Sequence, residues 1–192
     1  MPEIKICGIN DGDFAVAAER LGADYLGFIF AEASPRRVDA ALARAIIARL
    51  SGKVRKVGVY VRFPDLAAAK VIGLDVIQLH YRATAEEVAK VKAAGFECWA
   101  LAGGAVADAL LFDHSHGDGE TVLKAVPCKR VLAGGIGVKN LSAALASGAD
   151  ILDLSGSLEV APGVKSLRLL KEFFAALPPA ARQFPLAIGT EI

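Results

Sequence analysis

Short, strongly apolar segments recur along the whole chain, and alanine-rich segments with helical spacing separate them. This alternation constrains the fold more than any other feature of the sequence. Most of the apolar segments carry almost no polar residues, which is typical of parallel strands buried on both faces. We predict eight strands, at residues 4–7, 25–30, 56–61, 76–79, 96–101, 109–113, 130–133 and 151–154.

Helical segments lie between most of these strands, and capping residues mark several of their ends. Asp11 and Asp39 precede two of the segments, and glycines end several others. The predicted helices cover residues 11–21, 40–50, 64–72, 84–94, 139–147 and 164–177, with a weaker one at 119–125. The motif Gly-Ala-Asp occurs at 22–24 and again at 148–150, as two copies of one helix-to-strand joint.

Strands that alternate with helices indicate right-handed βαβ units, which close as a doubly wound sheet or as an eight-stranded barrel. The count of eight favours the barrel, and no G-x-G-x-x-G motif follows the first strand. We therefore predict a single (β/α)8 TIM barrel over residues 1–178, followed by a C-terminal tail at 179–192. Residues 103–108 are too few for an ordinary helix, so we expect the fifth helix to be reduced or missing.

The composition excludes several classes of protein. Hydrophobic residues make up 54% of the chain and charged residues 22%, which excludes a disordered protein. The net charge of +1 predicts no partner among nucleic acids or membranes, and no apolar segment reaches the ~18 residues of a membrane span. Three widely spaced cysteines and no signal peptide favour a reduced, cytoplasmic location. A monomer and a homodimer both remain open.

Barrel enzymes hold their active sites at the carboxyl ends of the strands, and polar or small residues gather there in this sequence. Gly134 and Gly135 follow the seventh strand, and Ser155 and Gly156 follow the eighth. Backbone amides can approach an anion closely at such positions, so we predict a phosphate site there. The alternative is that these glycines only form tight turns.

Three reactive side chains lie at other strand ends. Cys7 ends the first strand, where a thiol is a base or nucleophile if its neighbours lower its pKa, and otherwise a buried structural cysteine. Asp113 ends the sixth strand, where a carboxyl group is a general acid if burial raises its pKa, and otherwise a loop cap. Arg36 lies in the loop after the second strand, where its guanidinium can bind a carboxylate or phosphate through two hydrogen bonds. The alternative is that Arg36 is only a solvent-exposed charge of the loop.

Three histidines, His80, His114 and His116, also follow strand ends, so a metal site must be considered. No nearby acidic residue completes a known ligand spacing, and we predict no metal.

Lys5 shares strand parity with Cys7, so both side chains point the same way. A lysine inside a barrel needs a partner, and Asp153 on the adjacent eighth strand is the predicted one.

The segment Lys5-Ile6-Cys7-Gly8-Ile9 resembles the K-I-C-G-[IL] opening of the phosphoribosylanthranilate isomerases, barrel enzymes of tryptophan biosynthesis. The resemblance spans residues 3–177. It includes Gly22-Ala23-Asp24, Ser34-Pro35-Arg36, Gln78-Leu79-His80, Leu132-Ala133-Gly134-Gly135-Ile136 and Pro162-Gly163-Val164-Lys165.

This resemblance implies a cofactor-free Amadori rearrangement, the third step of tryptophan synthesis from chorismate. N-(5-phosphoribosyl)anthranilate, a phosphorylated small molecule, would become 1-(2-carboxyphenylamino)-1-deoxyribulose 5-phosphate. The resemblance makes Cys7 the general base and Asp113 the general acid. It also implies that Arg36 holds the anthranilate carboxylate, that His80 lines the substrate site, and that the glycine loops hold the phosphate.

Some positions depart from the family pattern: Tyr81 replaces a glycine, Arg37 replaces an aromatic residue, and the loop after Asp113 is short and carries Asp118. Two alternatives follow. The first is a barrel acting on another phosphosugar, as an isomerase or as a metal-dependent epimerase in which at least two histidines converge. The second is a barrel that only binds a phosphorylated ligand, in which Cys7 and Asp113 do not face one cavity.

Overall fold

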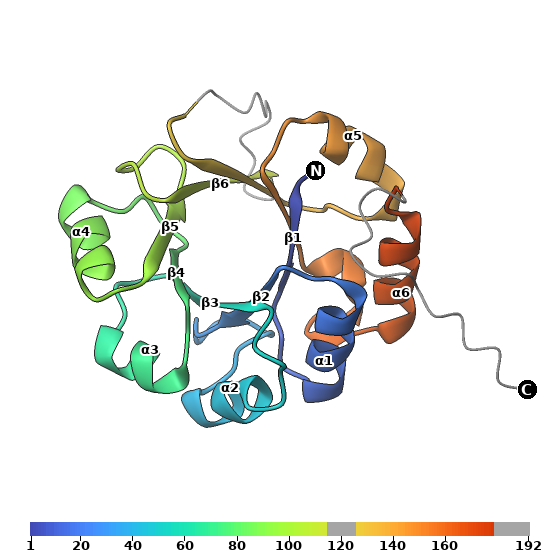
Figure 1. Cartoon of the computed structure of the whole chain (residues 1–192), viewed down its shortest axis with the longest axis horizontal. Coiled ribbons are helices and arrows are strands. Elements are labelled where there is room, and N and C mark those ends of the chain that lie inside the picture. Colours follow the sequence, from blue (N-terminus) through green and yellow to red (C-terminus); the bar gives the residue numbers. More distant parts are fainter. Residues whose placement is uncertain (115–125, 179–192) are drawn as a thin grey trace, which may run out of the picture.

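Eight parallel strands form a closed barrel in the computed structural model of the chain, which describes residues 1–114 and 126–178 (Figure 1). The strands are hydrogen-bonded in sequence order, and the eighth closes on the first. They are β1 (Glu3–Cys7), β2 (Tyr25–Ile29), β3 (Arg55–Tyr60), β4 (Val76–Leu79), β5 (Glu97–Leu101), β6 (Ala109–Asp113), β7 (Lys129–Ala133) and β8 (Ile151–Leu154). The predicted TIM barrel is confirmed, and each strand end lies within one residue of its predicted position.

Helices surround the barrel (Figure 1). They are α1 (Gly12–Leu21), α2 (Ala40–Ile47), α3 (Leu66–Ile72), α4 (Ala85–Ala93), α5 (Leu141–Ala146) and α6 (Leu167–Ala176). No helix joins β5 to β6 within residues 102–108, so the missing fifth helix is confirmed. The predicted helix at 119–125, Asp118 and the tail at 179–192 lie outside the described residues.

The predicted start of the last helix at residue 164 is wrong. Val164–Lys165 form a short strand, β10, which pairs antiparallel with β9 (Glu159–Ala161). The helix α6 begins only after Ser166, whose hydroxyl accepts a hydrogen bond from the backbone N–H of Leu169 at 3.4 Å. Residues 164 and 165, which the spacing predicts to be helical, therefore belong to the β9–β10 hairpin, and this hairpin lengthens the loop after β8.

Other helix boundaries also differ from the prediction. The helix α3 begins after Asp65, whose carboxylate accepts from the backbone N–H groups of Ala67 and Ala68, so Pro64 lies outside the helix. The helix α2 ends at Ile47 rather than at residue 50, and residues 138–140 form a short 3-10 helix before α5. These ends depend on local hydrogen bonds, which helical spacing alone does not locate.

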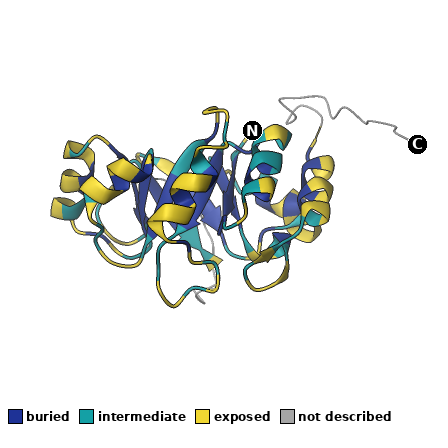
Figure 2. Cartoon of the chain, turned by 90° about the horizontal axis from the view of Figure 1, so that it is seen from below, coloured by how far each residue is buried: buried dark blue, intermediate teal, exposed yellow. Residues whose placement is uncertain are grey.

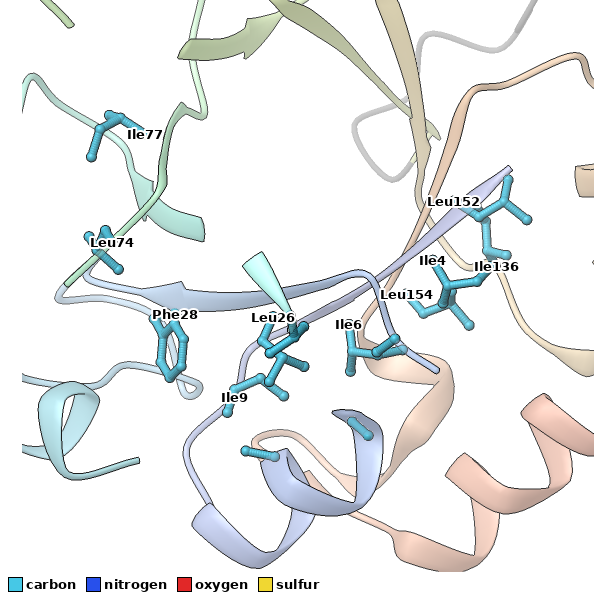
Figure 3. Packing of buried hydrophobic residues seen from close by; sticks show 14 of the residues in the cluster. Ile4, Ile6, Ile9, Leu26, Phe28, Leu74, Ile77, Ile136, Leu152 and Leu154 are labelled. Atoms are coloured by element: carbon cyan, nitrogen blue, oxygen red, sulfur yellow. The ribbon is translucent and has the colours of Figure 1, made fainter. Parts of the chain in front are cut away.

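Successive side chains of each strand point alternately into the barrel and out toward the helices. Figure 3 shows Ile6, Ile9 and Leu26 on the side of the strands that faces α1. Figure 2 shows the buried strands enclosed by helices whose outer faces are exposed. The buried hydrophobic residues that point inward are Cys7, Tyr25, Val57, Val59, Val76, Trp99, Ala109, Leu111, Val131, Ala133 and Ile151. The last inward residue of each strand therefore faces the carboxyl end of the interior.

An aspartate precedes each even-numbered strand and accepts a hydrogen bond from the backbone of the preceding odd-numbered strand. The four bonds are Ile4 N to Asp24 Oδ2 at 2.7 Å, Lys56 N to Asp75 Oδ2 at 2.7 Å, Cys98 N to Asp108 Oδ2 at 2.9 Å, and Arg130 N to Asp150 Oδ2 at 2.8 Å. The two Gly-Ala-Asp joints of the sequence are thus members of a set of four. They lie at the amino-terminal end of the barrel, where TIM barrels carry residues for stability.

Aromatic and charged side chains fill the barrel at this amino-terminal end. Tyr25 and Trp99 meet edge to face, with ring centroids 4.9 Å apart. The indole Nε1 of Trp99 donates to Glu97 Oε1 at 2.6 Å, and the Arg55 guanidinium lies 5.7 Å from the Tyr25 centroid. The interior is therefore occupied at this end, which leaves the carboxyl end of the strands for a substrate.

Candidate active site

Cys7 ends β1 on the inner face of the barrel and is only 7% exposed. Gly27 lies beside it in the register of β2. A Cβ atom on Gly27 would lie 2.8 Å from the Cys7 Sγ, so the glycine makes the room that the thiol occupies. Burial raises the pKa of the Cys7 thiol, while the ammonium of Lys5 acts in the opposite direction.

Lys5 lies one inward position below Cys7 and is fully buried. Its Nζ donates to Asp153 Oδ2 at 2.5 Å, so the predicted Lys5–Asp153 contact is confirmed. The register of β1 and β8 sets these two residues side by side. The other carboxylate oxygen of Asp153 has no hydrogen-bond partner among the described residues.

Asp113 ends β6 in register with the inward-facing Ala133 of β7. The His80 Nε2 lies 3.7 Å from the Asp113 Oδ2, so the structure brings these two predicted site residues together. Gln78 lies one inward position below His80 and is 1% exposed, and its Nε2 is 3.3 Å from the His80 Nδ1. The sequence alone predicts no role for Gln78, although a glutamine within an apolar strand, two residues before a histidine, is a usable signal.

Arg36 lies in the loop after β2 and packs over Gly8. The Nε and Nη2 of Arg36 donate to the two carboxylate oxygens of Glu159 at 2.8 and 2.7 Å. Gly8 has a φ of 78°, and a Cβ there would lie 2.7 Å from the Arg36 Cδ. Gly8 is thus required for two reasons: its backbone is left-handed, and the Arg36 side chain occupies the space that a Cβ atom would need.

Lys165 completes the same corner of the site, with a side chain that is 1% exposed. Its Nζ donates to Glu159 Oε1 at 2.9 Å and to the Ser155 carbonyl at 3.1 Å. Burial lowers the pKa of Lys165, and Glu159 acts in the opposite direction. The Ser155 hydroxyl donates in turn to the Cys7 carbonyl at 3.2 Å. The sequence alone predicts no role for Glu159 or Lys165, although their opposite charges flank a Pro-Gly turn.

The two glycine loops predicted to bind phosphate lie against each other. Gly134 and Gly135 have φ values of 93° and 67°, and a Cβ on Gly135 would meet no atom within 4 Å. The Ser157 hydroxyl donates to the Ile136 carbonyl, which ties the loop after β8 to the loop after β7. Gly156 begins a single 3-10 turn in the second loop. Small residues of two neighbouring loops therefore form one surface at the carboxyl end.

The described residues contain no group of three or more His, Cys, Asp or Glu side chains that could hold a metal ion. His116 lies outside those residues. Within the same residues, no helix has the length and apolar character needed to cross a membrane.

Comparison with known proteins gives consistent matches. The model of the family described as N-(5'phosphoribosyl)anthranilate (PRA) isomerase matches residues 4–176. An N-(5'-phosphoribosyl)anthranilate isomerase of Rubrobacter xylanophilus is 35% identical, over 92% of this chain and 98% of the relative.

Solved structures agree with these matches. The phosphoribosyl anthranilate isomerase of Thermus thermophilus has a TM-score of 0.77 and 35% identity, and the match covers 91% of this chain and 97% of that one. A phosphoribosyl anthranilate isomerase in complex with reduced 1-(o-carboxyphenylamino)-1-deoxyribulose 5-phosphate has a TM-score of 0.76 and 27% identity, with 92% and 98% covered.

Proposed function

The chain belongs to the N-(5'-phosphoribosyl)anthranilate isomerase family, and from that membership we propose the reaction and the roles of its site residues. The reaction is the Amadori rearrangement of N-(5'-phosphoribosyl)anthranilate to 1-(2-carboxyphenylamino)-1-deoxyribulose 5-phosphate, in tryptophan biosynthesis. Cys7 is the general base and Asp113 the general acid. One observation carries these roles: both side chains end strands on the inner face of one closed barrel, at its carboxyl end.

Asp113 acts first by giving a proton to the furanose ring oxygen. The bond from C1 to that oxygen then breaks, and the lone pair of the anthranilate nitrogen forms the C=N bond of a protonated Schiff base. His80, with its Nε2 3.7 Å from the Asp113 carboxylate, orients the acid and lines the site. The side-chain amide of Gln78 contacts the His80 Nδ1 and helps to hold the imidazole ring in place.

Cys7 acts next, as the thiolate, by removing the proton from C2 of the sugar. The electron pair of the C2–H bond forms the C1=C2 bond and neutralises the nitrogen, which gives an enolamine. The enolamine becomes the ketone when C1 gains a proton and the enol oxygen loses one. Solvent then restores the protonation states of Cys7 and Asp113, so the whole reaction is an isomerisation.

The substrate has two anionic ends, and the site offers two places for them. The guanidinium of Arg36, fixed by Glu159, binds the anthranilate carboxylate. The loops that carry Gly134, Gly135, Ser155 and Gly156 bind the phosphate through backbone N–H groups. Binding at both ends holds the sugar between the acid and the base, which favours a catalytic barrel over one that only binds a phosphorylated ligand.

Complementation of a tryptophan-requiring bacterial strain that lacks this isomerase tests the reaction. We expect growth with the native chain and none with soluble Cys7→Ser or Asp113→Asn. A soluble native chain that neither restores growth nor converts N-(5'-phosphoribosyl)anthranilate in a purified assay would overturn the proposal. The cytoplasmic location and the choice between monomer and homodimer stay predictions.

A further inference from the structure

Three polar or charged residues among those described are buried as whole residues, and all three point into the barrel: Lys5, Gln78 and Asp153. Gln78 supports His80, but the proposed reaction uses neither member of the Lys5–Asp153 pair. Burying an ion pair costs several kcal/mol per ion in desolvation, and apolar replacements of similar volume are often neutral or stabilising. The remainder of the inward cluster is largely apolar. Stability alone therefore does not account for an ion pair at this level of the barrel.

The position of the Lys5–Asp153 pair next to Cys7 explains why an ion pair is buried there. Lys5 and Cys7 are two residues apart on the same face of β1. Burial raises the pKa of the Cys7 thiol, and the charge of Lys5 acts against that effect. A thiolate formed in this buried place loses most of its solvation and needs a nearby cation. The other cations that act on Cys7 are Lys165 and Arg36, which lie in loops beyond the strands and share the carboxylate of Glu159. The charge of Lys5 lowers the pKa of the Cys7 thiol, and that of Asp153 raises it by less.

We propose that the Lys5 ammonium is the counter-cation of the Cys7 thiolate, and that Asp153 keeps Lys5 charged and in place. Both are positioning residues, because they act on the substrate only through Cys7. The proposal deepens the proposed function, since it rests on the role of Cys7 as the base.

Asp153 is needed because burial alone would remove the charge of Lys5. Burial lowers the pKa of Lys5, but the Asp153 carboxylate and the nearby thiol raise it above its ordinary value. Two other groups, His80 and Asp113, act on Asp153 from across the interior. The Asp153 carboxylate, bound to the Lys5 Nζ at 2.5 Å, therefore favours the charged form of Lys5 beside the Cys7 thiol. Without Lys5, the Cys7 thiolate forms only at higher pH.

The test compares thiol titrations in the absence of substrate. Cys98→Ala and Cys128→Ser are introduced first, so that only Cys7 titrates. In this background, Lys5→Met/Asp153→Leu removes both charges together and leaves no unpaired buried ion. The thiolate is followed by its ultraviolet absorbance and by the pH dependence of alkylation with iodoacetamide. We expect the pH midpoint of Cys7 ionisation to rise, because the variant removes the lowering effect of Lys5 together with a smaller raising effect of Asp153. The rise should be less than the ~1–3 pH units that follow from losing one nearby opposite charge alone.

Lys56→Met is the matched control, because Lys56 forms a similar lysine–aspartate pair, with Asp75 at 2.6 Å, on the outer face of β3. In the Lys56→Met variant, the pH midpoint of Cys7 ionisation should equal that of the parent. If the double variant does not fold, Lys5→Gln, which keeps a donor for Asp153, serves in its place with the same expected direction. A folded variant at Lys5 whose midpoint equals that of the parent overturns the proposal.

A second readout separates this proposal from the proposed function. The acidic limb of the pH profile of kcat/KM should move by the same amount as the thiol midpoint, with kcat reduced and KM little changed. A shifted thiol midpoint in a protein that does not isomerise N-(5'-phosphoribosyl)anthranilate supports the counter-cation and rejects the enzymatic role. An unshifted midpoint in an active enzyme does the reverse.

Discussion

Arg36 and Glu159, which are 123 residues apart in the sequence, form a two-point ion pair at the mouth of the barrel. The Glu159 side chain is 4% exposed and also accepts from Lys165. Although burial opposes it, the hydrogen bonds from Arg36 and Lys165 hold the pKa of Glu159 below its ordinary value. Glu159 thus stays an anion between two cations and fixes the direction of the Arg36 fork.

Glu159→Gln tests whether substrate binding depends on the orientation that Glu159 gives to the Arg36 guanidinium. The amide cannot accept from both nitrogens of Arg36, so the guanidinium loses its fixed position for the substrate carboxylate. We expect KM to rise about tenfold, which corresponds to ~1.4 kcal/mol, with kcat little changed. Steady-state kinetics provide the measurement. Glu172→Gln, which breaks the exposed pair with Arg168 on α6, is the control and should leave both constants unchanged. An unaltered KM in folded Glu159→Gln would mean that Arg36 needs no such support.

Gly27→Ala tests the space around the base. The added methyl group would lie 2.8 Å from the Cys7 Sγ, so the thiol must move. A displacement of about 1 Å at a reacting group costs up to ~10²-fold in rate, and we expect a loss of that order in kcat. Gly12→Ala is the matched control, because the new methyl group there meets only the flexible end of Arg49. Equal kcat values for the two variants would contradict the expectation.

Cys7→Ser and Asp113→Asn test the acid and the base themselves. Each variant keeps the shape of the side chain but removes its ability to transfer the proton, and each should lose about 10²–10⁴-fold in kcat. The double variant should lose much less than the product of the two, because the residues act in one reaction. Purified protein and a direct assay of substrate conversion give the rates. Retained activity in either single variant removes that residue from its proposed role.

Much of this site was predictable because it depends on local patterns. Strand ends follow from short apolar runs, and the carboxyl ends of the strands are the sites of barrel chemistry. The Lys5–Asp153 pair was predictable as well, since parity gives the direction of Lys5 and barrel closure makes β8 the neighbour of β1.

The Arg36–Glu159 pair was not predictable in the same way. Glu159 begins β9, a strand of three residues that pairs with β10, a strand of two, and such short strands leave no periodic signal. The same hairpin explains the wrong start of α6. Two of the four aspartate joints were also missed, because Asp75 and Asp108 do not follow Gly-Ala and only the fold reveals what they share.

Asp24→Ala tests the contribution of one aspartate joint to stability. The substitution leaves the backbone N–H of Ile4 without the acceptor that it has at 2.7 Å. A buried donor that loses its partner costs about 1–3 kcal/mol, so the free energy of unfolding should fall by that amount. Urea unfolding gives the value. Asp13→Ala, at an exposed aspartate of α1, should cost clearly less. A similar loss in both variants would show that the joint has no special weight. Activity per folded molecule should be preserved, since the joint is far from the catalytic end.

Asp24 and Asp150 occupy equivalent joints, yet their contributions to the free energy of unfolding should change with pH in opposite directions. The hydrogen bond from Arg130 lowers the pKa of Asp150 below its ordinary value of 3.8, whereas burial raises the pKa of Asp24 above it. A lowered pKa gives stability that is complete above pH 3.8 and lost as the pH falls through the folded-state value. A raised pKa gives stability that is complete below pH 3.8 and lost as the pH rises through the folded-state value.

The measurement is urea unfolding of the native chain, Asp24→Asn and Asp150→Asn between pH 3 and pH 7, a range that brackets the ordinary carboxyl pKa of about 4. Relative to the native chain, Asp150→Asn should be most destabilised at neutral pH and should approach it in acid. Asp24→Asn should move the other way, gaining on the native chain as the pH rises, because an amide avoids the cost of a buried charge. Parallel curves for the two variants would contradict the assignment of these shifts. Opposite slopes would support a lowered pKa for Asp150 and a raised pKa for Asp24, although both carboxylates accept the same kind of backbone hydrogen bond.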